Sequence, residues 1–247
     1  MFTTRSMGLS ALVLAAILAV GAATASADII NPVLTINVLD SGGAVKGSYS
    51  VDVPASGLLV WTATFADPGK EIIDSLGNTL AIINGLEVEL QGDPVVKVGF
   101  NVTAIGSDQT FEFISPVVSF AGLTNPAAYA SAGVTVTGNG NGATLTGLLT
   151  GSLAYEARYN GGSVFAGLIA PTTAPIDDTA TLNDRFPLTG TVAIPGTVTN
   201  ISSTFKFTLT ADDDASGTSR FEVTPEPATL ALLGFGAIAM IARRRKA

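Results

Sequence analysis

The sequence predicts an all-β protein, and three observations carry that prediction. Apolar and polar residues alternate with a period of two through most of the interior. Polar turn sequences rich in glycine, asparagine and aspartate separate the alternating runs. No interior segment of helical length has a convincing 3.6-residue period. Together these features favour an antiparallel β-sandwich of jelly-roll or immunoglobulin-like type.

The strands follow from this alternation. In 95–103, Val96, Val98 and Phe100 fall on one face, whereas Lys97 and Asn101 fall on the other. The same reading predicts strands, in chain order, at 33–39, 45–53, 58–65, 86–90, 95–103, 110–114, 133–137, 143–157, 163–169, 190–194, 203–210 and 219–223.

Two segments depart from this pattern. Residues 67–78 are expected to form one or two turns of helix at the edge of the sandwich, and 170–187 to form a long surface loop. The sequence has no fixed-period repeat and no linker long enough to divide it. We therefore expect one exported sandwich domain at 28–223, with about ten to twelve strands.

Histidine and cysteine are both absent. Their absence excludes disulfides, thiolate nucleophiles, zinc fingers and a Ser-His-Asp triad. Residues 28–224 hold seven basic and nineteen acidic side chains, a formal charge of −12. Such a charge repels phosphate backbones, so a nucleic-acid partner is not expected.

Two groups of carboxylates are candidate sites. Asp212 and Asp214, in the acidic run 211–220, supply oxygen ligands at alternate positions, as calcium requires, although a solvated hairpin turn explains the same residues. The second group, on the expected loop, consists of Asp177, Asp178 and Asp184. A carboxylate pair facing across a cleft would serve glycoside hydrolysis. No cofactor other than calcium is expected.

Aromatic residues offer a third candidate site, because exposed rings on one sheet face can bind sugars. The candidates are Trp61, Tyr49, Tyr129, Tyr155 and Tyr159. Trp61 alternates with apolar neighbours, which favours a place in the core.

The first 27 residues have the pattern of a signal peptide. Arg5 precedes an apolar stretch from Gly8 to about Ala23, and Ala25-Ser26-Ala27 forms a small-residue cleavage site. We expect a signal helix that is removed after Ala27. The alternative is an uncleaved anchor helix.

The last 24 residues, 224–247, have three parts. Pro225, Glu226 and Pro227 come first, an uncharged apolar run follows at 228–242, and Arg243, Arg244 and Arg245 form a basic stop. As a helix the run would span about 22 Å, and snorkelling arginines could extend it across a bilayer. The positive-inside rule keeps those arginines in the cytoplasm and the domain outside the inner membrane.

This tail resembles the PEP-CTERM sorting signal. Pro225 to Pro227 match the recognition motif, 228–242 match the transmembrane helix, and Arg243 to Arg245 match the basic end. The resemblance implies that an exosortase, a membrane protease, recognises the tail and releases the protein to the cell surface or extracellular matrix. A plain single-pass anchor is the alternative reading of the same residues.

Three functions remain in view. The first is an exported, non-enzymatic surface or matrix protein, structural or adhesive within exopolysaccharide. The second is a carbohydrate-binding module, which would need exposed aromatic residues. The third is a polysaccharide-cleaving enzyme, which would need two opposed carboxylates in a groove.

Overall fold

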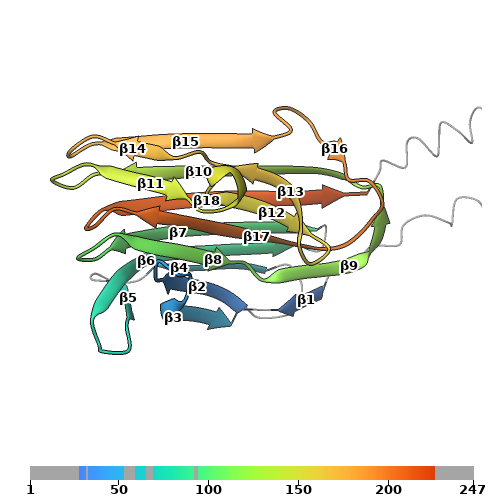
Figure 1. Ribbon diagram of the computed structural model, residues 1–247. Helices are drawn as coiled ribbons and strands as arrows, with labels where there is room; N and C mark the ends of the chain where they lie inside the picture. The colour runs from blue at the N-terminus through green and yellow to red at the C-terminus, as the bar shows by residue number, and fades with distance from the viewer. Residues whose placement is uncertain (1–27, 32, 53–58, 65–68, 92–93, 226–247) are drawn as a thin grey trace, which may run out of the picture.

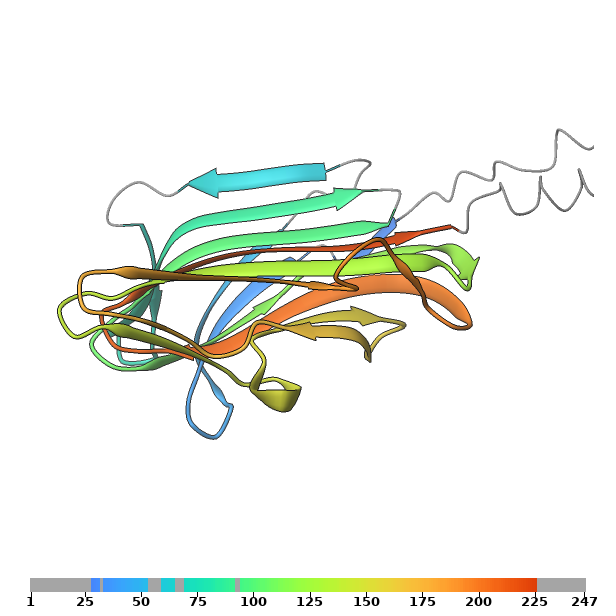
Figure 2. The same ribbon diagram turned by 90° about the horizontal axis from the view of Figure 1, so that it is seen from above.

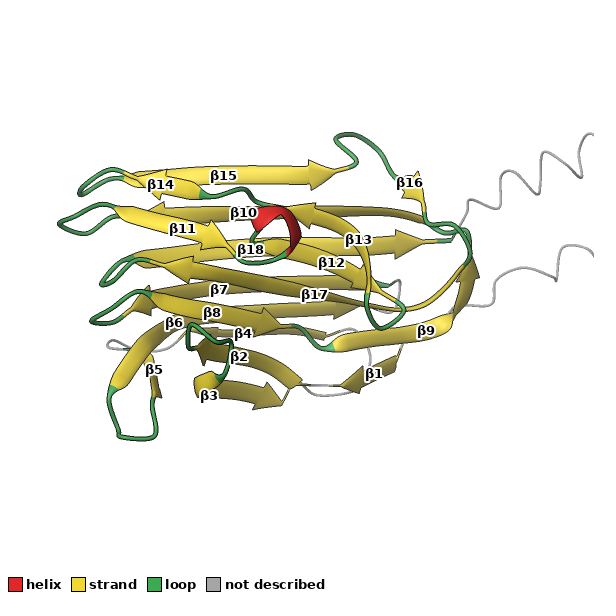
Figure 3. Ribbon diagram, viewed as in Figure 1, coloured by secondary structure: helices red, strands yellow, loops and turns green. Residues whose placement is uncertain are grey.

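A computed structural model describes residues 28–31, 33–52, 59–64, 69–91 and 94–225. Within them the chain forms eighteen strands and one 3₁₀ turn, Thr150–Ser152, and the strands build two antiparallel sheets (Figures 1 and 3). The all-β prediction is confirmed. The expected signal helix (1–27) and transmembrane helix (228–242) lie outside the described residues.

Sheet A contains ten strands, and its main path runs β1-β9-β17-β8-β2-β3. Their bounds are Asp28–Asn31 (β1), Val117–Thr124 (β9), Thr197–Leu209 (β17), Gln109–Ile114 (β8), Val33–Leu39 (β2) and Val45–Asp52 (β3). Four further strands extend the sheet: Ala143–Gly147 (β11), Tyr155–Tyr159 (β12), Ser163–Leu168 (β13) and Thr172–Ala174 (β14). Strands β11 and β12 pair with β17, β14 pairs with β11, and β13 pairs with β12.

Sheet B contains eight strands, and its main path runs β15-β10-β18-β7-β6-β4. Their bounds are Thr179–Phe186 (β15), Ala127–Thr137 (β10), Asp214–Thr224 (β18), Val95–Ala104 (β7), Thr79–Gln91 (β6) and Leu59–Thr64 (β4). Val192–Ala193 (β16) pairs with β10, and Lys70–Ile73 (β5) pairs with β6.

The core lies between the two sheets, which form two layers when seen from above (Figure 2). Phe100 of β7 stacks on Phe113 of β8 at 4.3 Å between ring centroids, and its ring lies 5.0 Å from that of Phe205 of β17. Gly217 of β18 makes room for this ring, because a Cβ there would meet Phe100 Cζ at 2.5 Å. Aromatic packing across the layers therefore joins the sheets.

The expected helix at 67–78 is wrong over its described part. Residues Lys70–Ile73 form β5, in which Ile72 is buried. The Asp74 carboxylate accepts hydrogen bonds from the backbone N–H groups of Leu76 and Asn78, which closes a tight turn into β6. Because the turn captures these N–H groups, the segment folds as a hairpin.

The expected surface loop at 170–187 is also wrong, since it contains β14 and β15. Ala180 and Leu182 of β15 pack against the core, while Thr181 and Asn183 point outward.

The expected strand at 143–157 is interrupted after Gly147. A Cβ on Gly147 would lie 2.2 Å from the Leu153 carbonyl carbon. Glycine at 147 therefore leaves room for the backbone of Leu153 to pack against the end of this strand.

Candidate functional site

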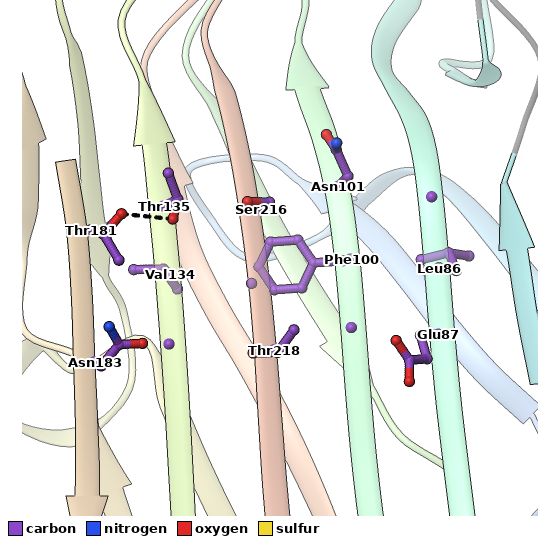
Figure 4. Close-up of a pocket in the computed structure, with 14 residues that line it drawn as sticks. Leu86, Glu87, Phe100, Asn101, Val134, Thr135, Thr181, Asn183, Ser216 and Thr218 are labelled. Atoms are coloured by element: carbon purple, nitrogen blue, oxygen red, sulfur yellow. Dashed lines mark hydrogen bonds between the residues drawn. The ribbon is translucent and has the colours of Figure 1, made fainter. Parts of the chain in front are cut away.

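A hollow in the outer face of sheet B is the candidate site, and we call it the sheet B groove. Its volume is about 340 Å³. It crosses five neighbouring strands, β6, β7, β18, β10 and β15 (Figure 4). Leu86, Phe100 and Val134 also line it but are buried. The lining side chains that are exposed or half-exposed are polar: Glu87, Asn101, Ser216, Thr218, Thr135, Thr181 and Asn183.

Glycines make the floor of the groove. Gly99 lies between Glu87 and Thr218 in the strand register, and Gly133 lies between Thr218 and Asn183. A Cβ on Gly133 would meet Asn183 Oδ1 at 2.3 Å, so the amide lies over the glycine. Glycine inside a strand lets another group approach the backbone closely.

Most polar side chains of the groove have no hydrogen-bond partner within the described part of the chain. Thr135 and Thr181 share a hydrogen bond at 2.9 Å, drawn in Figure 4. Among the described residues, no side-chain hydrogen bond is made by Glu87, Asn101, Asn183, Ser216 or Thr218. The site therefore offers free amides and hydroxyls, which can both donate and accept hydrogen bonds.

Charged pairs lie beside the groove, on the next row of the same face. Lys97 pairs with Glu89, and Arg220 pairs with Glu222 at 2.6 Å. Tyr129 donates a hydrogen bond to Glu222 at 3.0 Å. Burial raises the pKa of Tyr129, and the bond to Glu222 raises it further. Lys97 and Arg220 are therefore already neutralised by neighbouring acids, whereas Arg185 donates hydrogen bonds to the carbonyl oxygens of Pro187 and Gly190.

The four predicted tyrosines, whose side chains the structure describes, do not form a platform. Tyr155 is fully buried against Phe205, with ring centroids 4.9 Å apart. Tyr49 and Tyr159 are half-buried and pack against the core. Tyr129 lies under the Arg185 guanidinium at 4.6 Å. Trp61 pairs with Val88 in the register, and its side chain lies outside the described residues.

Of the three candidate glycosidase carboxylates, Asp184 lies apart from the other two. Asp178 precedes β15, and its carboxylate accepts a hydrogen bond from the Thr179 backbone N–H. Asp184 lies six residues further along that strand, a separation of about 20 Å at ~3.3 Å per residue. Glycosidase pairs need about 5 to 9.5 Å. Asp177 accepts a hydrogen bond from Gly140 N in a turn.

The acidic run at 212–214 forms the turn between β17 and β18. Asp212 accepts a hydrogen bond from Gly106 N, and Asp213 accepts one from Asn139 N. Asp214 accepts hydrogen bonds from Thr103 and from the Asn139 amide. In the described part of the chain, no three acidic residues gather where they could hold a metal ion. The calcium site at Asp212 and Asp214 stays a prediction.

The sorting segment follows directly on strand β18. Strand β18, between β10 and β7, finishes at Thr224, and Pro225 is exposed directly after it. A family model for the PEP-CTERM protein-sorting motif matches residues 223–246. The chain carries a PEP-CTERM sorting motif. This motif supports an exported protein that an exosortase sorts.

Most of the PEP-CTERM motif lies outside the described residues, including Glu226, Pro227 and Arg243 to Arg245. No helix in the described ranges is long and apolar enough to cross a membrane. Membrane anchoring by 228–242 therefore stays a prediction.

Comparisons with curated proteins and with solved structures do not identify a fold family or a function for this chain. The search of curated proteins found no match. The enzymatically active domain of tailspike protein 4 from bacteriophage CBA120 matches 77% of this chain at 12% identity and a TM-score of 0.28, and this chain spans 19% of that one. Two infectious bursal disease virus structures, of the Gx strain and of the VP2 subviral particle, match 90% of this chain and 75% of theirs at 8% and 9% identity, with TM-scores of 0.12 and 0.13. Scores this low carry no argument about fold or function.

Sequence reasoning missed the sheet B groove. A signal for it exists, since glycines inside predicted strands indicate a close approach of another group. Gly99 and Gly133 lie in such strands. Only the register shows that both flank Thr218 on one face.

Proposed function

We propose that this protein is an exported, non-enzymatic surface protein with a structural or adhesive role in an exopolysaccharide matrix. The observation that carries the proposal is the PEP-CTERM motif at 223–246, attached directly to the last strand of a β-sandwich. The motif supports export and sorting, and the sandwich is the part that is delivered.

The described acidic residues support a non-enzymatic role. The carboxylate of Asp184 lies on β15, apart from those of Asp177 and Asp178, which accept backbone hydrogen bonds just before that strand. The carboxylates of Glu89 and Glu112 are paired with lysines. This arrangement favours neither an acid–base pair nor a nucleophile with a base beside it.

The proposed route has three stages. The signal peptide directs export, the apolar tail holds the protein in the inner membrane with the sandwich outside, and an exosortase then cuts near Pro225. The exposure of Pro225 at the end of β18 suits this step, because a protease needs an accessible, extended segment.

The test is the intact mass of the protein recovered from the culture medium and from the membranes of its native host. We expect the released form to start at Asp28 and to end near Pro225. Replacing Pro225, Glu226 and Pro227 with alanine should remove the released form and leave a longer one in the membrane.

The matched control replaces three exposed residues of the β5–β6 hairpin, Glu71, Ser75 and Leu76, with alanine. This variant should be released like the natural protein. Equal release of the Pro225–Pro227 variant would contradict the sorting proposal, and an uncut tail in every fraction would leave a plain membrane anchor.

A further inference from the structure

The sheet B groove is open at both sides. Two further hollows adjoin it, one sharing Glu87, Gly99 and Thr218 and the other sharing Gly133, Asn183 and Thr218. Five strands about 4.8 Å apart make the groove about 19 Å across. An open hollow of this length suits an extended polymer better than an enclosed small molecule.

The inner strands beneath the groove, β7, β18 and β10, cannot take up a peptide as an added strand. Strands β6, β7, β18, β10 and β15 pair with one another in an unbroken order. The backbone groups of the inner three are therefore committed to their neighbours on both sides. A ligand on this face must bind through side chains, which excludes strand addition at this place.

The free side chains define the chemistry of the ligand. Asn101 and Asn183 each carry an amide that both donates and accepts, and Ser216 and Thr218 carry hydroxyls that do the same. A ligand that matches such groups along its length must itself alternate donors and acceptors. Polyhydroxylated chains have this property.

The charges of the groove and of the domain indicate whether the polymer is neutral or anionic. Glu87 is the single ionisable side chain among the groove residues, and the nearby Lys97 and Arg220 are paired with Glu89 and Glu222. The domain carries a formal charge of −12. Arg185, in the adjoining hollow, has no acidic partner among the described residues, and its guanidinium donates hydrogen bonds to the carbonyl oxygens of Pro187 and Gly190. Anionic polymers would therefore meet repulsion from the domain, and the cations near the groove already have partners.

One wall of the hollow at Asn183 is apolar. Leu188 lines that hollow with Arg185, and the residue is 83% exposed. An exposed leucine beside free amides offers contact to the C–H face of a sugar ring while the amides bind its hydroxyls. This combination is typical of sites with few polar anchors and an apolar wall.

We propose that the sheet B groove binds a neutral polysaccharide chain, with Asn101 and Asn183 as its main hydrogen-bonding anchors. The ligand lies across the strands, over the floor made by Gly99 and Gly133. This inference rests on the proposed function, because a matrix protein needs a surface that holds the matrix polymer.

The experiment is affinity electrophoresis of the protein recovered from the native host. The gels contain the neutral fraction of the host's own exopolysaccharide, separated from the anionic fraction by ion exchange, or the anionic fraction itself. We expect the neutral fraction to retard the natural protein and the anionic fraction to leave it unchanged.

The variant Asn101→Ala with Asn183→Ala should weaken the retardation at least about tenfold, because two hydrogen-bonding anchors are lost. The control, Asn141→Ala, removes an exposed amide from the turn between β10 and β11 and should bind normally. Circular dichroism and the thermal midpoint should be unchanged in both, since all three side chains are exposed and make no hydrogen bond within the described residues.

Three results would overturn the proposal: no retardation by the neutral fraction, retardation only by the anionic fraction, or equal retardation of the double variant. Release of the double variant into the medium separates this proposal from the proposed function. Normal release without binding contradicts the groove alone, whereas binding without release contradicts the sorting route.

Discussion

Tyr155 shows how single side chains are placed in this core. It is fully buried, and its hydroxyl has no hydrogen-bond partner among the described residues. Burial raises the pKa of its phenol, and interactions with the Ser219 and Ser203 hydroxyls, neither of which has hydrogen-bond geometry to the phenol oxygen, offset this only in part. The phenol is therefore neutral. Its buried oxygen destabilises the folded state, because it has lost its hydrogen bonds to water without gaining a partner in the protein.

Replacing Tyr155 with phenylalanine should raise the free energy of unfolding by about 1 kcal/mol, because the replacement removes a buried unsatisfied hydroxyl and keeps the ring on Phe205. Urea unfolding followed by circular dichroism measures the change. Tyr155→Ala is the control and should lower the same quantity by about 3–5 kcal/mol, since it leaves a cavity. A clear loss in the phenylalanine variant would mean that the hydroxyl has a bonding partner in solution.

At the scale of elements, pairs of charged side chains link neighbouring strands on the outer face of sheet B. Lys97 of β7 donates to Glu89 of β6, and Arg220 of β18 lies close enough to act on the same carboxylate. The bond from Lys97 lowers the pKa of Glu89, and the partial burial of the carboxylate opposes this lowering. The pair therefore stabilises the fold when Glu89 is ionised.

Glu89→Gln should lower the free energy of unfolding by about 1 kcal/mol near pH 7. Because the pKa of Glu89 is lower in the folded state, this contribution is complete above the ordinary glutamate pKa of about 4.3 and is lost as the pH falls through the folded pKa. Urea unfolding at about pH 7 and about pH 3 should show the difference between the two proteins shrink in acid. For the exposed Glu71, the variant Glu71→Gln should change little at either pH. An undiminished Glu89→Gln effect in acid would assign the loss to packing.

At the scale of the whole molecule, we expect the two sheets to unfold together. Phe100 reaches from sheet B into the aromatic cluster of sheet A, where Phe113, Phe205 and Phe207 surround it. No disulfide can hold the layers, because the chain has no cysteine. Apolar packing therefore holds the two layers together.

Phe100→Ala should lower the free energy of unfolding by about 3–5 kcal/mol and keep a single transition. Near- and far-ultraviolet circular dichroism during heating would measure this, with the exposed Leu76→Ala as the control. Two separate transitions would show that the sheets unfold independently. A reducing agent should leave the midpoint unchanged in every variant, since there is no disulfide to break.

The sequence by itself determined the all-β class, several of the strands and the sorting tail. These features are local: alternation along 95–103 or 203–210 shows which side chains share a face, and the tail is recognised from consecutive residues. Local signals failed at 67–78 and 170–187. There, a turn at Asp74 and the partner strand β10 decided the structure, and neither appears in a short window of sequence.

Only the tertiary structure decided the strand order, the burial of Tyr155 and the separation of the candidate carboxylates. It also brought Glu87, Gly99, Thr218, Gly133 and Asn183 into one row, although they lie far apart along the chain. The physical reason is that the register between strands depends on which faces can be buried together. That choice is made by the whole core, including the Phe100 cluster that joins its layers.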